Sequence, residues 1–247
     1  MVIELITLTV VASGPVRMGA AEALPVLDSL TEERSHFARL ETAARELPSN
    51  YARLWEAARA GAALGAALGD TEEARMVLKS AIGLAGAAAA LVPDGVEGHY
   101  WAAASAGLLA DVEGERTKIR AAERAWQESE RVLALDSLHA GAHHIQGRLN
   151  AAVMRLGWVK RTLAKHLLGA ELLGRASWEE AERHLRLASE LAPEEPVHHL
   201  ELGVVYADLG RMEDARRAFE ATLSAPSHRA ADEAYKMRAL ELLAGPM

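Results

Sequence analysis

A spacing that occurs three times limits the folds open to this chain of 247 residues. A residue unfavourable within helices is followed six positions later by histidine in Pro93–His99, Ser137–His143 and Pro193–His199. Four positions beyond each histidine stands a small residue, namely Ala103, Gly147 and Gly203. Such recurrence predicts helical hairpins stacked into a solenoid, because each unit can bury its apolar face only against its neighbours.

Composition indicates an all-α fold. Half of the residues are hydrophobic, many of them alanine and leucine, and only 4% are aromatic. Alanine and leucine favour helices, whereas strands are enriched in β-branched and aromatic residues. The absence of cysteine excludes disulfides, thiolate metal sites and a cysteine nucleophile. A net charge of -8 argues against a nucleic-acid partner.

The N-terminus contains features of an export signal. Residues 2–12 form an apolar run, and Ala21-Glu22-Ala23 suits a signal peptidase. Residues 1–23 are therefore a candidate signal peptide or disordered N-terminus, which favours an exported, periplasmic protein over a cytoplasmic one. Glu4, and the lack of a preceding Lys or Arg, leave a cytoplasmic start or a weak anchor open. The apolar run 81–92 is too short to span a membrane, so we expect no transmembrane segment in the mature domain, residues 31–245.

Apolar periodicity and breakers predict a series of short helices after a linker that contains Pro25. Asp70 and Glu73 form a candidate N-cap pair, and Ser177 with Glu180 forms a capping box. The expected helices cover 31–47, 51–68, 70–92, 96–110, 116–135, 140–157, 178–191, 196–209, 212–224 and a final segment from about 229.

The last full unit has the tetratricopeptide repeat (TPR) pattern of large and small residues. Gly203 and Ala215 would let two antiparallel helices touch, while Tyr206 and Phe219 would fill the remaining gap. The pattern predicts an all-α, TPR-like α-solenoid, a right-handed superhelix of four hairpins with a helix before the first and a capping helix after the last. Counting from Pro196 as position 1, the matching residues are Leu202 at 7, Gly203 at 8, Tyr206 at 11, Gly210 at 15, Ala215 at 20 and Phe219 at 24.

The spacing of the recurring histidines also predicts two insertions. The histidines lie 44 and 56 residues apart, whereas a TPR unit has roughly 34 residues. The extra length falls around 111–118 and around 155–176. Insertions in solenoids tend to cluster on one face, which often binds a ligand.

Six short stretches in and around the insertions form a distinctive series, namely 115–119, 143–148, 156–158, Lys160, 167–169 and 177–181. In order and spacing they resemble the TPR-like domain of the regulator of microtubule dynamics family, over about residues 50–245. The resemblance implies an adaptor domain without a known catalytic centre. Animal relatives are associated with microtubules and with contacts between endoplasmic reticulum and mitochondria, and one branch is linked to phospholipid binding. The Ala- and Arg-rich composition is typical of a bacterial homologue.

An acid-free stretch suggests a binding patch. Residues 137–170 contain no Asp or Glu, and five basic residues alternate there with apolar ones. Such a segment can bind phosphate or carboxylate groups. The alternative is an amphipathic helix that plugs the end of the groove and keeps its charges solvated. The basic residues are Arg148, Arg155, Lys160, Arg161 and Lys165.

The repeat phase predicts which side chains face the concave groove. The resulting surface is mostly apolar with one guanidinium, which suits an extended peptide or an acyl chain with an anionic head group. The alternative is that the C-terminal helix or the inserted segment fills the groove. The candidate ligand-binding residues are Tyr100, Ala104, His144, Arg148, Ala151, Leu200 and Val204, together with Lys160 and Arg161 of the insertion.

No motif predicts catalysis, a metal site or a cofactor. The three recurring histidines occupy one structural position in successive units, so they should lie a repeat apart instead of converging on one metal ion. We expect them to pack or to hydrogen-bond at helix starts. Gly61 and Gly65 lack the Lys and Ser/Thr of a phosphate-binding loop. The sequence therefore predicts a non-catalytic scaffold for a protein or peptide; the alternative is a carrier of lipids or small amphiphiles, with Arg148 and Lys160 on an anionic head group.

Overall fold

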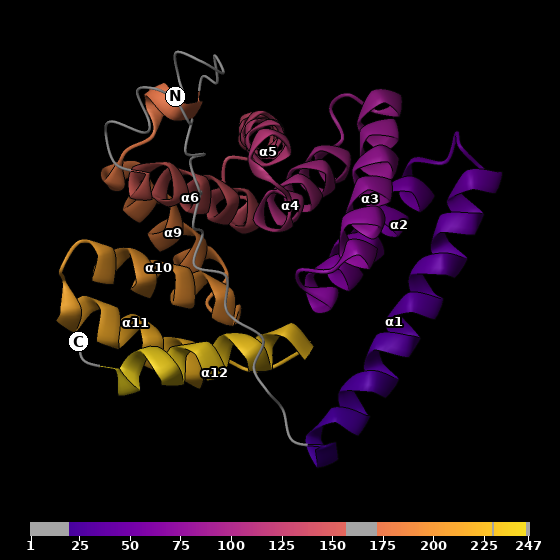
Figure 1. Ribbon diagram of the computed structural model, residues 1–247. Coiled ribbons are helices and arrows are strands. Elements are labelled where there is room, and N and C mark those ends of the chain that lie inside the picture. The colour runs from indigo at the N-terminus through magenta and orange to yellow at the C-terminus, as the bar shows by residue number, and fades with distance from the viewer. Residues whose placement is uncertain (1–19, 157–171, 229, 246–247) are drawn as a thin grey trace, which may run out of the picture.

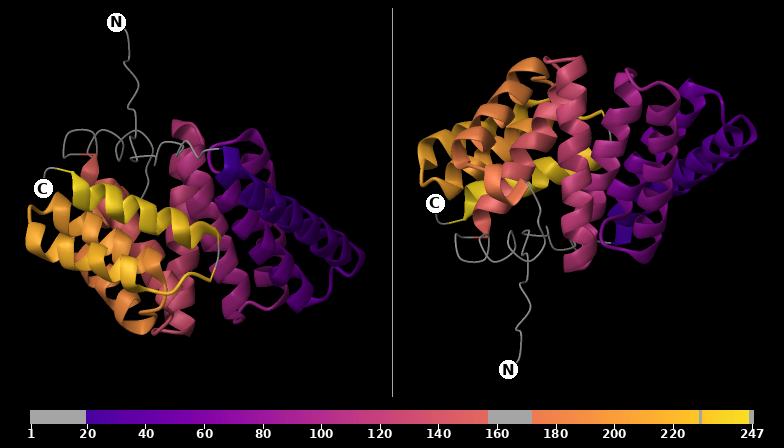
Figure 2. Two further views of the ribbon diagram at one scale, coloured as in Figure 1. Left: turned by 90° about the horizontal axis from the view of Figure 1, so that it is seen from below. Right: turned by 90° about the horizontal axis from the view of Figure 1, so that it is seen from above.

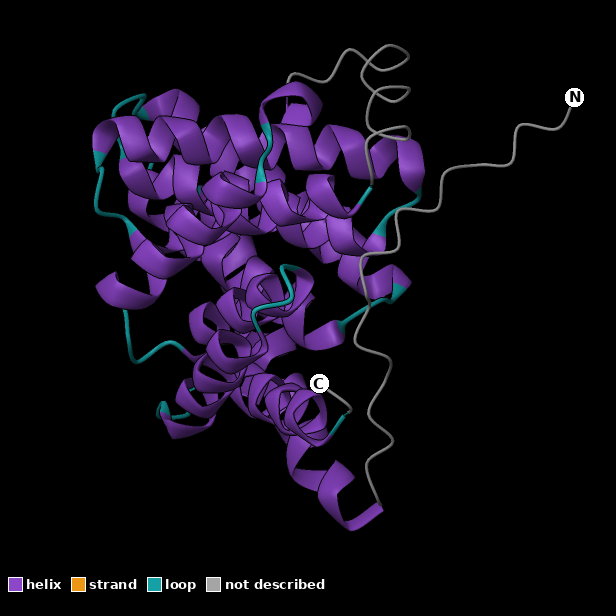
Figure 3. Ribbon diagram, turned by 90° about the vertical axis from the view of Figure 1, so that its left-hand side faces the viewer, coloured by secondary structure: helices purple, strands orange, loops and turns teal. Residues whose placement is uncertain are grey.

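The computed structural model describes residues 20–156, 172–228 and 230–245, and every regular element among them is a helix (Figures 1 and 3). The expected all-α fold is therefore confirmed. The helices are α1 (Ala20–Glu46), α2 (Tyr51–Leu68), α3 (Glu72–Leu91), α4 (Val96–Val112), α5 (Glu115–Leu135), α6 (Ala140–Arg155), α8 (Leu172–Arg175), α9 (Trp178–Leu191), α10 (Pro196–Asp208), α11 (Met212–Ser224) and α12 (Ala230–Ala244).

Four helical hairpins form the body of the molecule. They pair α2 with α3, α4 with α5, α6 with α9, and α10 with α11. We call the first helix of each hairpin A-type and the second B-type. Successive A-type helices also contact one another, so the hairpins stack along an arc, with α1 before the first and α12 after the last (Figure 2). The predicted right-handed TPR-like α-solenoid is confirmed.

Glycines allow the closest helix contacts within two hairpins. A Cβ atom added to Gly147 would lie 2.5 Å from Leu185 Cγ and 3.0 Å from the Leu185 backbone nitrogen. One added to Gly203 would lie 2.5 Å from the ring of Phe219, which is only 1% exposed. The repeat phase of the last hairpin agrees with these contacts, because a larger residue would push the two helices apart.

The recurring histidines close the turns that precede three A-type helices. Nε2 of His99 lies 3.0 Å from the carbonyl oxygen of Pro93, and His143 and His199 reach the carbonyls six residues before them at 3.0 and 2.9 Å. A carbonyl can only accept, so Nε2 carries the proton and donates in each case. The predicted hydrogen-bonding role at helix starts is confirmed. Among the described residues no group of three or more His, Asp or Glu side chains could hold a metal ion.

The start of α3 differs from the sequence prediction. The N-cap is Thr71, whose hydroxyl accepts from the Ala74 backbone at 3.1 Å, whereas Asp70 pairs with Arg75. The Asp70–Glu73 cap was therefore wrong, since the hydroxyl one residue later already meets the free amide. At α9 the predicted cap is confirmed, because the Ser177 hydroxyl accepts from Glu180 N at 3.1 Å.

The ends of the chain and the two insertions also differ from the simple expectation. Helix α1 begins at Ala20, so Pro25 lies inside a helix instead of a linker. The first extra length is absorbed by the long helices α4 and α5, not by a loop. Most of the second insertion, residues 157–171, lies outside the described residues, as do residues 1–19 of the predicted signal peptide. Cleavage of that peptide stays a prediction.

Helix α3 includes most of the apolar run 81–92. Among the described residues it is the one helix that is long and apolar enough to cross a membrane. In the fold α3 packs between α2 and α4, and its Leu78, Ala81 and Ala85 are fully buried. A helix packed in the core of a solenoid can have the same length and composition.

Candidate binding surface

The A-type helices α4, α6 and α10 form a surface that α12 partly covers. We call this surface the concave trough. Helix α12 packs on α10 and α11 and also touches α2, so it crosses from the last hairpin toward the first (Figures 1 and 2). The alternative in which the C-terminal helix fills the groove therefore holds for the part of the trough made by α10.

Arg148 of α6 lies in the middle of the trough between two carboxylates. Its NH2 nitrogen is 3.0 Å from Asp111 Oδ2 of α4, and its Nε is 3.2 Å from Glu201 Oε1 of α10. The Arg148 side chain is 30% exposed. Asp111 and Glu201 raise the pKa of Arg148 above its ordinary value, since both negative charges favour the charged form. The predicted guanidinium is present, but this protein already neutralises it.

A second ion pair between α6 and α10 lies two helical turns further along α6. Arg155 contacts Asp208 through NH2 at 2.7 Å and through Nε at 2.8 Å. Arg148 and Arg155 are seven residues apart on α6, and so are Glu201 and Asp208 on α10. Residues at this spacing lie on one face of a helix, so the two pairs form a ladder that joins α6 to α10.

We expect the ladder to contribute measurably to stability. Arg148→Gln leaves the partly buried Asp111 and Glu201 without the cation they share, and we expect it to cost on the order of 1–3 kcal/mol in the free energy of unfolding. Urea unfolding followed by circular dichroism measures this cost. The control is Arg186→Gln, because the exposed Arg186–Glu190 pair at 3.8 Å should contribute less than about 0.5 kcal/mol. Equal effects of the two variants would contradict a structural role for Arg148.

The other predicted ligand residues divide into an accessible and a buried group. Tyr100, Ala104, His144 and Val204 are partly exposed. Ala151 and Leu200 are only 1% and 5% exposed, which corrects the expectation that both line an open groove.

The burial of these two residues has different causes. Ala151 packs in the core between α6, α9 and α10, beside Leu185 and Leu202. Leu200 packs beneath α12 with Tyr235 and Ala239. Lys160 and Arg161 lie outside the described residues, so their binding role stays a prediction.

His144 is held by a histidine of the next A-type helix. Its Nδ1 lies 3.1 Å from Nδ1 of His198, and the ring centroids are 4.8 Å apart. Burial, and then the charges of His198 and Arg148, lower the pKa of His144 well below its ordinary value. A neutral imidazole is therefore present in the trough, which suits contact with a peptide better than capture of an anion.

A second histidine pair connects α6 to α9. Nδ1 of His143 and Nδ1 of His184 are 2.7 Å apart, and both side chains are below 10% exposed. His143 donates from Nε2 to a carbonyl, so its Nδ1 must accept and His184 Nδ1 must donate. The Nε2 of His184 then accepts from Arg183 at 2.8 Å. Burial first, and then Arg183 and His143, lower the pKa of His184 to about 4.

The sequence did not predict the carboxylates that form ion pairs with the arginines of the trough. Asp111, Glu201 and Asp208 all lie outside the acid-free stretch 137–170. They reach Arg148 and Arg155 from the neighbouring A-type helices. A clue was present in the sequence, because Glu201 and Asp208 have the same seven-residue spacing as the two arginines.

The chain matches one family of known proteins over most of its length. The family described as regulator of microtubule dynamics protein 1-3 matches residues 23–245. The chain belongs to this family. The resemblance first based on the inserted segments is confirmed. In this member of the regulator of microtubule dynamics family, the trough is lined by α4, α6 and α10 and bordered by α12.

A solved structure of a TPR protein has a similar fold. A thermophilic TPR protein of Thermus thermophilus is 19% identical, with 88% of this chain and 93% of that chain covered and a TM-score of 0.58. The structure of MamA is less similar, at 13% identity, with 90% and 99% covered and a TM-score of 0.45. No curated protein matches the chain.

Proposed function

We propose that this protein is a non-catalytic scaffold that binds a segment of a partner protein in the concave trough. The observation that carries the proposal is the strip of α4 and α6 in which Tyr100, Ala104 and Arg148 remain partly exposed beside α12. These positions supply an aromatic ring, a small residue and a fork of hydrogen-bond donors. A peptide uses such a surface by placing apolar side chains in shallow pockets and its polar groups on a few fixed donors.

The charge distribution favours a peptide over an anionic amphiphile at this surface. Arg148 already contacts Asp111 and Glu201, so an anionic head group would have to compete with two carboxylates of the protein itself. A peptide carbonyl needs only one free guanidinium donor. The amphiphile carrier is therefore the second prediction, with less support than the scaffold.

Substitution within the trough tests the scaffold function. Ala104→Glu adds a charge and bulk to the exposed strip of α4, and we expect it to reduce recovery of a trough-bound partner about tenfold, as the loss of one well-made contact does. Affinity purification from native cells with quantitative mass spectrometry measures the recovery. The matched control is Ala134→Glu, because Ala134 is exposed on α5, a B-type helix, away from the trough. Both variants are first compared with the parent by thermal unfolding.

Two results would contradict the scaffold proposal. The first is a set of captured proteins that is identical in the parent, Ala104→Glu and Ala134→Glu. The second is a stoichiometric anionic amphiphile in an organic extract of the purified protein that disappears in Arg148→Gln. That second result would establish the carrier function instead.

A further inference from the structure

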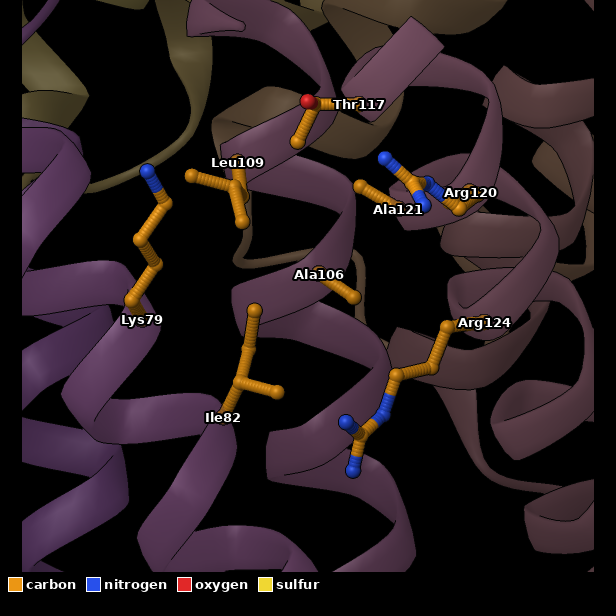
Figure 4. A pocket seen from close by; sticks show the side chains of 8 residues that line it. All are labelled: Lys79, Ile82, Ala106, Leu109, Thr117, Arg120, Ala121 and Arg124. Atoms are coloured by element: carbon orange, nitrogen blue, oxygen red, sulfur yellow. The ribbon is translucent and has the colours of Figure 1, made fainter.

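A cavity on the other side of the A-type helices is chemically unlike the trough. It is lined by residues of α3, α4 and α5 and has a volume of about 230 Å³ (Figure 4). Ile82 of α3 and Leu109 of α4 supply apolar surface. Lys79 of α3 and Arg120 and Arg124 of α5 supply three cationic groups.

The residues of α5 face the cavity because of their spacing. Thr117, Arg120 and Arg124 follow one another at intervals of three and four, which places them along one face of the helix. Lys79 and Ile82 are three residues apart on α3 and therefore also lie along one face of their helix. Figure 4 shows the two rows of side chains facing each other across Leu109. Two helices that are far apart in the chain thus contribute to one cationic rim.

The positive charges of the rim are only partly neutralised. Lys79 Nζ lies 2.6 Å from Glu113 Oε1, so its charge is paired. Arg124 Nε is 3.8 Å from Glu128 Oε1, and the other oxygen of Glu128 lies 2.7 Å from His99 Nδ1. Arg120 is exposed and has no hydrogen bond or ion pair with any described residue. The rim therefore retains donors for a ligand, in contrast to Arg148 in the trough.

A glycine allows one of these arginines to reach across the cavity. A Cβ atom added to Gly86 of α3 would lie 2.9 Å from an NH2 nitrogen of Arg124. The guanidinium therefore rests directly on the α3 backbone, where any larger residue would displace it. Gly83, one turn earlier, has open space around its missing side chain. At Gly86, α3 therefore has no side chain where Arg124 of the rim approaches it.

We propose that the α3–α5 cavity binds a small organic anion that carries one phosphate or carboxylate group on a short apolar body. The guanidinium groups of Arg120 and Arg124 form forked hydrogen bonds to the anionic group, with the Thr117 hydroxyl beside them. The apolar body contacts Ile82 and Leu109. The volume is below the usual range for drug-sized ligands, which limits the ligand to an anionic group and a few carbon atoms. This site is separate from the trough and does not depend on the proposed scaffold function.

The test is a titration of the full chain with n-butyl phosphate, followed by ¹H–¹⁵N NMR at low ionic strength. The amides of Ile82 and Ala121, two of the residues that line the cavity, report locally on it. We expect their signals to shift, and both Arg120→Gln and Arg124→Gln to weaken binding about tenfold, the usual effect of losing one charge-assisted hydrogen bond. Arg186→Gln is the matched control, since Arg186 has the same i,i+4 pair at 3.8 Å on the B-type helix α9 and should bind as the parent does.

Three further ligands separate the contributions to binding. Inorganic phosphate and butan-1-ol should each bind more weakly than n-butyl phosphate, because each lacks one half of the proposed ligand. Dodecyl phosphate should bind no more tightly, because the cavity is too small for its chain. Unchanged signals of Ile82 and Ala121, equal binding of inorganic phosphate, binding of dodecyl phosphate alone, or binding unaffected by both arginine variants would each overturn the proposal.

Discussion

Gly147→Ala should destabilise the protein by about 3 kcal/mol, the upper end of the usual overpacking cost, although it adds only one methyl group. The added Cβ would lie 3.0 Å from the Leu185 backbone nitrogen and 3.1 Å from the Ala181 carbonyl oxygen. A side chain can rotate away from such a contact, but a helix backbone cannot. Helices α6 and α9 must therefore separate, and the core around Leu185 loses contacts.

Urea unfolding measures this effect as a shift of the midpoint. Gly83→Ala is the control, since Gly83 is also inside a helix but has no neighbouring atom within 4 Å of its added Cβ. Alanine there should stabilise the protein by roughly 0.5–1 kcal/mol through its better helix propensity. If Gly147→Ala unfolds at the parent's urea concentration, the close approach of α6 and α9 is incorrect.

Acidification from pH 7.5 to pH 5 should remove about 2 kcal/mol of stability through the His143–His184 pair. The pKa of His184 is about 4 in the folded protein, below the ordinary value of 6.5. Between these values the unfolded chain binds more protons than the folded one. The contribution is therefore complete above pH 6.5 and is lost as the pH falls toward 4. The lowered pKa values of His143 and His144 act in the same direction.

Urea unfolding at a series of pH values between 7.5 and 5 measures the slope. His184→Gln should be less stable than the parent at pH 7.5 but should lose much of the slope, because it removes the group whose pKa is lowered to about 4. His36→Gln, at an exposed position, should leave both the stability and the slope unchanged. A slope that persists in His184→Gln would show that other groups cause the acid sensitivity.

Much of the fold was predictable because its signals are local and periodic. Proline and glycine mark the turns, alanine and leucine mark the helices, and Gly203 with Phe219 marks the repeat phase. The errors in local structure were similarly local, as at Thr71, where one of two neighbouring capping residues had to be chosen. The candidate site was less predictable, since the exposure of Leu200 depends on where α12 packs, and helix phase alone does not contain that information.

The sequence by itself determined the helical hairpins, their small-residue contacts and the histidines that close three of the turns, because all of these depend on residues close in the chain. Only the tertiary structure decided what each repeated residue meets. His99 faces Glu128, whereas the equivalent His143 faces His184, and Arg148 is paired by Asp111 and Glu201, 37 and 53 residues away. Helix lengths and stacking between units set these partners, and a repeat pattern specifies neither.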